Sequence, residues 1–350
     1  MNAVVENATA PRAPATAPHA THKFKLLLKR EFWEHKGGFL WAPLIAGGIS
    51  LLLSAMAIVV GLVAAHRSGV ADELEVDGVN INGLDLGSLT SKMDATEMAQ
   101  FAQGIDLTLI LSSSWPFIVM SFVVFFYCLG ALYDDRKDRS VLFWKSLPLS
   151  DSQTVLSKVV SAVVVAPVIA VAATVATMFG FLLIISVVVL AYGGNPLTLL
   201  WGPASPLAVA ASHLAWIPVY ALWALPTVGW LLLCSAWARS KPFLWAIMVP
   251  LFAGIFVAWF DLMQLFDLAT SWFWIHVVAR MLLGTVPGSD LLYRDNAGLE
   301  SAEGLDALFA NMSPAGQLSS LAMPELWVGA VAGALMIFAA IRLRRWRDDG

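Results

Sequence analysis

The chain is poor in charge and in cysteine. Only 13% of its 350 residues are Asp, Glu, Lys or Arg, whereas 59% are hydrophobic and the mean hydropathy is +0.74. This composition excludes an ordinary water-soluble globule and predicts a membrane protein that crosses the bilayer several times. The two cysteines, Cys128 and Cys234, both lie inside apolar runs, which argues against a disulfide framework or a thiolate metal site.

Patterns for catalysis and cofactor binding are missing as well. The sequence has no phosphate-binding loop ending in Gly-Lys-Ser/Thr, no dinucleotide-binding glycine pattern after a strand, no His-Glu-x-x-His and no Cys-x-x-Cys. We therefore expect no catalytic residue, no metal site and no cofactor on this chain. Any ATP and Mg²⁺ would bind to a partner protein, and no nucleic-acid partner is expected.

Long apolar runs dominate what is present. Crossing the hydrocarbon core takes about 20 helical residues, and the runs that reach this length are 39–65, 108–133, 159–190, 207–237, 243–263 and 325–343. A break at Gly180 would divide the third run into two spans. However, six spans place all but four of the 21 basic residues on one side. Because basic residues concentrate on the cytosolic side, we predict six spans with both termini in the cytosol.

The segments outside the runs complete the expected organisation. Residues 1–20 are rich in Ala and Pro, which predicts a disordered tail. Residues 39–263 carry the first five spans, and residues 325–350 carry the sixth span followed by a basic cytosolic tail. Residues 66–107 are acidic and should form a small extracytoplasmic cap with a short helix from Ser91 to Gln103.

Residues 264–324 should form a second extracytoplasmic segment. Their apolar stretch is too short to span, which predicts an interfacial or re-entrant helix with Trp272 and Trp274 at the headgroup level. His276 and Arg280 are four residues apart on one face of this helix. They would hold an anionic headgroup or substrate at the outer leaflet, or they are simply a solvated pair.

Residues 21–38 combine positive charge with apolar residues near helical spacing. This pattern predicts an interfacial helix that lies on the anionic leaflet, and the alternative is a plain basic stop before the first span. The residues expected to face the membrane surface are Lys25, Leu28, Lys29, Phe32 and Trp33. In the sixth run, Gly329 and Gly333 allow close approach of another helix, either from the same chain or from a second copy.

The loop at residues 134–158 is charged at its start, where residues 134–139 should stay in water, and then becomes apolar. Bulky apolar side chains in such a loop belong in a protein groove or at the lipid surface. Pro148 should end a short helix, because the residue before a proline is pushed out of the helical region. Ser150 and Gln153 have the spacing of a capping box, so a second helix should begin there.

This order of parts resembles the permease subunits of ABC-2 type ABC transporters, and in particular exporters of type V. A basic interfacial helix, two spans, a charged loop whose short helix ends in Leu-Pro, and four further spans follow one another from Lys23 onward. In that family the short helix is a coupling helix that docks into a groove of the ATPase subunit. The resemblance implies coupling roles for Arg139, Ser140, Phe143, Trp144, Leu147 and Pro148.

The resemblance also implies partners and a location. It points to an ATPase subunit that binds ATP and Mg²⁺, to a second permease copy or a homologous permease, to membrane lipids, and to the inner membrane of a bacterium. The expected substrate is lipid-like, a peptide or drug-like, moved outward. One alternative is a secondary transporter, although the span centres carry almost no charge and no internal repeat is evident. The other is a non-transport assembly or sensor component whose loop docks a different partner.

The expected fold is therefore an all-α polytopic membrane protein. It should have six transmembrane helices, an N-terminal interfacial helix, a cytosolic coupling helix and small extracytoplasmic segments.

Overall fold

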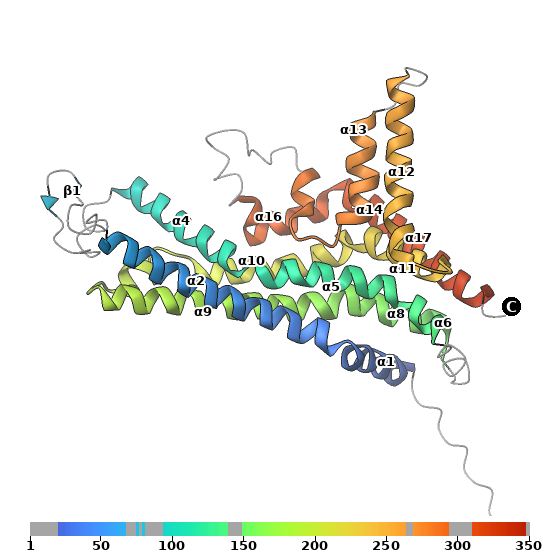
Figure 1. Cartoon of the computed structure of the whole chain (residues 1–350), viewed down its shortest axis with the longest axis horizontal. Coiled ribbons are helices and arrows are strands. Elements are labelled where there is room, and N and C mark those ends of the chain that lie inside the picture. Colours follow the sequence, from blue (N-terminus) through green and yellow to red (C-terminus); the bar gives the residue numbers. More distant parts are fainter. Residues whose placement is uncertain are drawn as a thin grey trace, which may run out of the picture.

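The computed structural model describes residues 20–67, 75–76, 79–80, 94–138, 149–263, 269–293 and 310–347. The described part is almost entirely helical (Figure 1). Its only strands, β1 (Glu75–Val76) and β2 (Val79–Asn80), form one short antiparallel pair. Six helices are long and apolar enough to cross a membrane. The protein is an all-α polytopic membrane protein, and the predicted fold class is confirmed.

The helices fall into two halves along the chain. The first half contains α1 (Ala20–Glu34), η1 (Gly37–Trp41), α2 (Ala42–Arg67), α4 (Ala95–Ser113), α5 (Trp115–Ala131), α6 (Tyr133–Lys137), α8 (Asp151–Val160), η2 (Ser161–Val165) and α9 (Ala166–Ala191). The second half contains η3 (Leu197–Trp201), α10 (Pro206–Trp223), α11 (Leu225–Trp237), α12 (Pro242–Leu262), α13 (Thr270–Phe273), η4 (Trp274–Ala279), α14 (Arg280–Leu283), η5 (Ser289–Tyr293), α16 (Pro314–Ser319), η6 (Ser320–Ala322) and α17 (Pro324–Arg347).

The second span belongs to a helix much longer than predicted. Elements α4, α5 and α6 run on over 42 residues, Thr96–Lys137. At about 1.5 Å per residue this is about 63 Å, roughly twice the hydrocarbon thickness. The short helix predicted from Ser91 to Gln103 is therefore wrong at both ends. It begins after Asp94, whose side chain caps it together with Glu97, and it continues past Gln103 because the single glycine that follows, Gly104, costs a helix interior only about 1 kcal/mol.

The third span is a single long helix, as the sequence predicted. Elements α8, η2 and α9 form one run of 41 residues, Asp151–Ala191. Gly180 lies inside α9, where Leu51 of α2 packs against it. The predicted capping box is confirmed, since the backbone N–H of Gln153 donates to Ser150 Oγ over 3.2 Å and the Ser150 N–H donates to Gln153 Oε1 over 3.5 Å.

The fourth apolar run is divided rather than continuous. Helix α10 ends at Trp223 and α11 begins at Leu225, with Ala224 between them. Pro226 accounts for the break, because a proline lacks the N–H that a helix needs and its ring clashes with the carbonyl four residues earlier. The 207–237 span predicted as one helix is thus two shorter helices.

Helix α11 packs closely on α17, and glycines make this contact possible. A Cβ placed on Gly333 would lie 2.4 Å from the carbonyl carbon of Leu225, and one on Gly229 would lie 2.6 Å from the Gly333 oxygen. Two backbones that approach so closely leave no room for side chains. Gly333 of the predicted glycine pair therefore serves packing within the chain, one of the two alternatives that the sequence left open.

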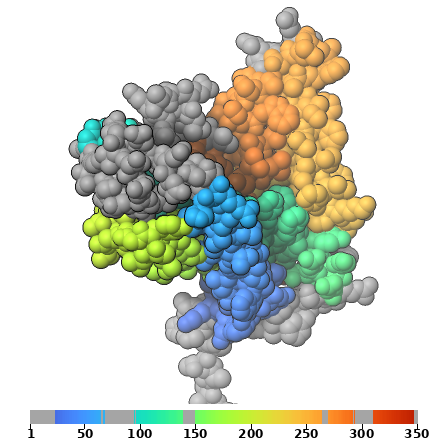
Figure 2. All heavy atoms as spheres, turned by 60° about the vertical axis from the view of Figure 1, so that its left-hand side comes forward, coloured from blue at the N-terminus to red at the C-terminus, as the bar shows by residue number. Residues whose placement is uncertain are grey.

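Helix α12 and the continuous helix α13–η4–α14 stand side by side as a hairpin (Figure 1). Trp274 packs against Gly254 of α12, whereas Trp272 is 55% exposed. The apolar helix predicted to lie at the interface is thus the returning arm of this hairpin. The hairpin runs across the direction of α2, α5 and α9 (Figures 1 and 2), so the six apolar helices are not one parallel set.

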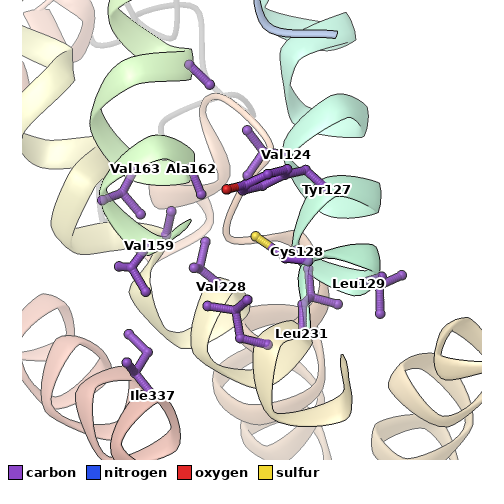
Figure 3. Close-up of a cluster of buried hydrophobic side chains, with 14 of the residues drawn as sticks. Val124, Tyr127, Cys128, Leu129, Val159, Ala162, Val163, Val228, Leu231 and Ile337 are labelled. Atoms are coloured by element: carbon purple, nitrogen blue, oxygen red, sulfur yellow. The ribbon is translucent and has the colours of Figure 1, made fainter. Parts of the chain in front are cut away.

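The main hydrophobic core lies where α5, α8, α11 and α17 meet (Figure 3). Val159, Val228, Leu231 and Ile337 approach one another there from three of these helices, and the Tyr127 hydroxyl points toward the α8–η2 segment. Cys128 and Cys234 are both buried and free. This core holds together the helix ends that carry the charged residues described next.

Candidate functional site

A group of buried charges gathers at the end of the bundle formed by α1, α6, α8 and the last turns of α17, which we call the α1 end (Figure 1). Five side chains from these four helices are joined by ion pairs. We call this group the charge network, and its members are Glu31, Asp135, Asp151, Lys158 and Arg344.

Lys158 lies at the centre of the charge network. Its side chain is 3% exposed, and its Nζ lies 3.2 Å from Glu31 Oε1 and 3.5 Å from Asp135 Oδ2. Burying an ammonium group costs several kcal/mol unless carboxylates compensate it. Two carboxylates do so here, and each comes from a different helix. Lys158 therefore ties α8 to both α1 and α6.

Arg344 extends the charge network to the last helix. Its Nη1 lies 3.4 Å from Asp135 Oδ2, and its Nε lies 3.3 Å from Asp151 Oδ1. Asp135 precedes residues 139–148 and Asp151 follows them. One guanidinium group thus bridges the two chain segments that lead into and out of the predicted coupling helix, and it connects both of them to α17.

Glu31 is held from a further direction as well. It is fully buried, and the Tyr127 hydroxyl of α5 donates a 2.8 Å hydrogen bond to Glu31 Oε2. The His35 ring packs edge-on against Tyr127 with 4.7 Å between the ring centroids. The carboxylate therefore fixes α1 against the second and third apolar helices.

Arg136 fastens the neighbouring end of α11. Its Nη2 donates hydrogen bonds to the backbone carbonyls of Ser235 and Ala238, which are among the carbonyls that a helix leaves unsatisfied at its C-terminus. The Ser235 hydroxyl in turn accepts from the backbone N–H groups of Leu132 and Tyr133 at 3.0 and 2.9 Å. Helix α11 is thereby anchored where α5 passes into α6.

The sequence prediction for the start of this loop is correct only in part. Asp134, Lys137 and Asp138 are exposed, as expected, whereas Asp135 is only 12% exposed and belongs to the charge network. Glu31 was not singled out at all. Its position four residues after Leu27, on the apolar side of the predicted interfacial helix, was the available signal.

The predicted interfacial helix packs on the protein itself. Leu27 and Glu31 are buried against the α8–η2 segment. Of the residues expected at the membrane surface, Lys25, Lys29 and Trp33 are exposed, and Leu28 and Phe32 are half-buried. Their contact with lipid stays a prediction.

The six residues predicted to couple to an ATPase lie outside the described residues. They are Arg139, Ser140, Phe143, Trp144, Leu147 and Pro148. What the structure describes is the pair of segments on either side, both of which enter the charge network.

His276 and Arg280 have different surroundings, although they share one helix. His276 is half-buried and stacks on Trp272. Arg280 is only 6% exposed, and its guanidinium carbon lies 3.2 Å from the centroid of the Trp223 ring. The alternative of a solvated pair is therefore wrong for Arg280.

Arg280 is enclosed without being hydrogen-bonded through its terminal nitrogens. Within the described part of the chain, Nη1 and Nη2 are buried and find no hydrogen-bond partner. A Cβ on Gly329 would lie 2.8 Å from Nη2, so this glycine leaves the space that the guanidinium fills. Arg280 lies outside the six apolar helices, and burial lowers its pKa to about 10, which leaves it charged at neutral pH.

The neighbouring Thr227 fixes the helix that carries Arg280. Its hydroxyl donates to the Arg280 carbonyl over 2.8 Å and accepts from the Gly284 N–H over 3.0 Å. Burial also raises the pKa of Tyr293, whose ring centroid lies 5.6 Å from the Arg280 guanidinium carbon. Arg280 thus connects α14 to both α10 and α17.

Comparisons of the chain with family models, with curated proteins and with solved structures find no match. Among the residues that the structure describes, no group of three or more His, Cys, Asp or Glu side chains is placed to hold a metal ion. The geometry of the α1 end is therefore the basis of the function proposed below.

Proposed function

We propose that the chain is the membrane-spanning permease subunit of an ATP-driven ABC exporter, in which a separate ATPase subunit binds ATP and Mg²⁺. The observation that carries the proposal is the charge network, because it joins α1, α17 and both segments that flank residues 139–148. A force applied to those ten residues would reach several helices at once.

The covalent connections define where such a force would go. Helix α6 continues α5, α8 continues into α9, and α1 leads through η1 into α2. Together with α17, these are four of the six helices long enough to span. Buried ion pairs resist separation, because parting them leaves uncompensated charge. Closure of an ATPase on the loop would therefore move the four helices as rigid bodies rather than bend the loop alone.

The proposal places the α1 end and both termini in the cytosol of a bacterium, with the spans in its inner membrane. A second permease copy, or a homologous permease, would complete the pathway for a lipid-like, peptide or drug-like substrate. A secondary transporter would need titratable groups near the middle of its spans, whereas the charge network lies at one end of the bundle. A non-transport assembly or sensor component would keep the docking loop but dock a protein without Walker motifs.

The deciding experiment removes the two large aromatic side chains of the predicted coupling helix. Phe143→Ala combined with Trp144→Ala should release the ATPase during purification and abolish stimulated ATP hydrolysis, because large aromatic anchors carry much of the energy of an interface. The measurements are co-purification of a protein with Walker motifs and the ATPase rate in proteoliposomes.

A matched control uses the same residue types elsewhere on the surface. Phe256 and Trp259 are 61% and 58% exposed on α12, so Phe256→Ala with Trp259→Ala should leave the complex intact. If the complex and its ATP hydrolysis persist in the Phe143 and Trp144 variant, the proposed coupling surface is wrong. If the protein that co-purifies carries no nucleotide-binding motif, the hypothesis of an assembly or sensor component replaces that of a transporter subunit.

A further inference from the structure

A groove opens between the α1–η1 bend and α5, beside the charge network, and two members of that network, Asp135 and Lys158, form part of its lining. Its volume is about 670 Å³, within the range of about 300–1,000 Å³ that is usual for small-molecule sites. One part of its lining is apolar and aromatic, and another part is acidic. A site divided in this way selects molecules that have an apolar part and a charged part.

The apolar wall is a regular stripe on α5. Phe122 and Phe126 line the groove and are 61% and 56% exposed. The same four-residue spacing continues through Gly130 to Asp134, so these four positions lie on one helix face. The stripe is about 18 Å long at about 1.5 Å per residue. Phe126 is also stacked on Phe243 of α12, with 6.0 Å between the ring centroids.

One carboxylate in the acidic part of the lining has no compensating cation among the residues that the structure describes. Glu34 pairs with Arg30 at 3.0 Å, and Asp135 is engaged by Lys158 and Arg344. The carboxylate of Asp134 is exposed and makes no ion pair or hydrogen bond with any residue that the structure describes. Lys158, the lysine in the lining, already contacts two carboxylates. The charge left unbalanced in the groove is therefore negative.

We infer that this groove binds a single-chain amphiphile with a cationic head, an amine or a quaternary ammonium group. The head lies at Asp134, and the alkyl chain lies along Phe126 and Phe122. Burial of the chain supplies attraction without direction, whereas the carboxylate selects the sign of the head. An anionic head would instead meet an unpaired carboxylate.

The glycines of the bend give access to the groove. A Cβ on Gly38 would lie 2.9 Å from a methyl group of Val123, so Gly38 sets the close approach of η1 to α5. A Cβ on Gly37, which also lines the groove, would meet nothing within 4 Å. A large side chain at position 37 therefore enters open space and occupies the groove without forcing the backbone apart.

The test is equilibrium binding to the full chain in lipid nanodiscs, with empty nanodiscs as the blank. Radiolabelled dodecyltrimethylammonium should bind saturably, and dodecyl sulfate, which has the same chain and the opposite charge, should not. Asp134→Asn should weaken binding of the cation about five-fold, the upper range for a partly exposed ion pair. Gly37→Phe should abolish saturable binding.

Two control variants make these results specific. Asp138→Asn removes another exposed carboxylate near the end of α6 and should leave the affinity unchanged. Gly48→Phe places the same bulk at another glycine whose Cβ meets nothing within 4 Å, and it should also bind normally. Equal binding of the cation and the sulfate, or an unchanged affinity in both Asp134→Asn and Gly37→Phe, would overturn the inference. Because no ATPase takes part, the outcome is independent of the proposed transport function.

Discussion

Two arginines of this protein are buried almost equally but have very different interaction partners. Arg280 is 6% exposed and Arg344 is 5% exposed. Arg344 lies between the carboxylates of Asp135 and Asp151. Arg280 instead lies against the ring of Trp223, and within the described residues its terminal nitrogens have no hydrogen-bond partner. Equal burial therefore does not imply an equal role.

The two arginines therefore have different roles: Arg344 holds helices together through ion pairs, whereas Arg280 mainly fills space between helices. Arg344 belongs to a set of charges from four helices in which each member compensates another. Removing one member leaves its partners buried and uncompensated, which is strongly destabilising, whereas an isosteric apolar replacement of a whole buried ion pair is often neutral. Arg280 makes no ion pair with any residue that the structure describes, although the buried carboxylate of Asp290 attracts it at longer range, so its replacement should cost less.

The largest effect is expected at Lys158, the buried ammonium group that contacts two carboxylates. Lys158→Met should destabilise the protein by about 3–5 kcal/mol, because Glu31 would remain fully buried without its cation and Asp135 would keep only Arg344. The measurement is an unfolding titration in mixed micelles followed by tryptophan fluorescence. Lys137→Met, at an exposed position of α6, should change stability by less than about 0.5 kcal/mol. Similar losses in both variants would contradict the charge network as a stabilising unit.

The direct test of the comparison replaces each arginine by methionine. Arg344→Met should cost about 2–3 kcal/mol, since it removes charge-assisted contacts to two carboxylates, one of which is partly solvated. Arg280→Met should change stability by less than about 1 kcal/mol, because the lost cation–π contact is offset by the lost cost of burying the charge. The same unfolding titration measures both variants. Equal effects would show that the partners make no difference.

Within the charge network the smallest effect is expected from loss of the Tyr127 hydroxyl, which contributes one hydrogen bond to Glu31. Tyr127→Phe should cost about 1.5 kcal/mol, the lower end for a hydrogen bond to a charged group, because Glu31 keeps Lys158 as a partner. Tyr133→Phe is the matched control, since no hydrogen bond to the Tyr133 hydroxyl is found among the described residues. A stability loss in Tyr133→Phe as large as that in Tyr127→Phe would assign the effect to packing.

Much of the membrane architecture was predictable from the sequence. The positions of the apolar helices follow from hydropathy, and the start of α8 follows from Ser150 and Gln153. These features depend on neighbouring residues, so a local pattern is enough to find them. The same reasoning failed at α4, where it expected an end near Gln103, and at Ala224, where Pro226 divides a run that is continuous in hydropathy.

The candidate site was far less accessible to that reasoning. Asp135, Lys158 and Arg344 were counted as ordinary charges near the ends of spans, and Glu31 was overlooked. The hydrogen bond from Tyr127 to Glu31 joins residues 96 positions apart, and the contact from Arg344 to Asp135 joins residues 209 positions apart. No periodicity in a single sequence reports such pairings.

By itself, the sequence determined that this chain is a membrane protein and which of its stretches are apolar enough to cross the bilayer. Both follow from the free energy of transfer into hydrocarbon, which is set by each residue and its near neighbours. The tertiary structure alone decided which charges are compensated and which glycine lies against which helix. Those outcomes depend on the distance and orientation between helices, and that geometry exists only once the helices have packed.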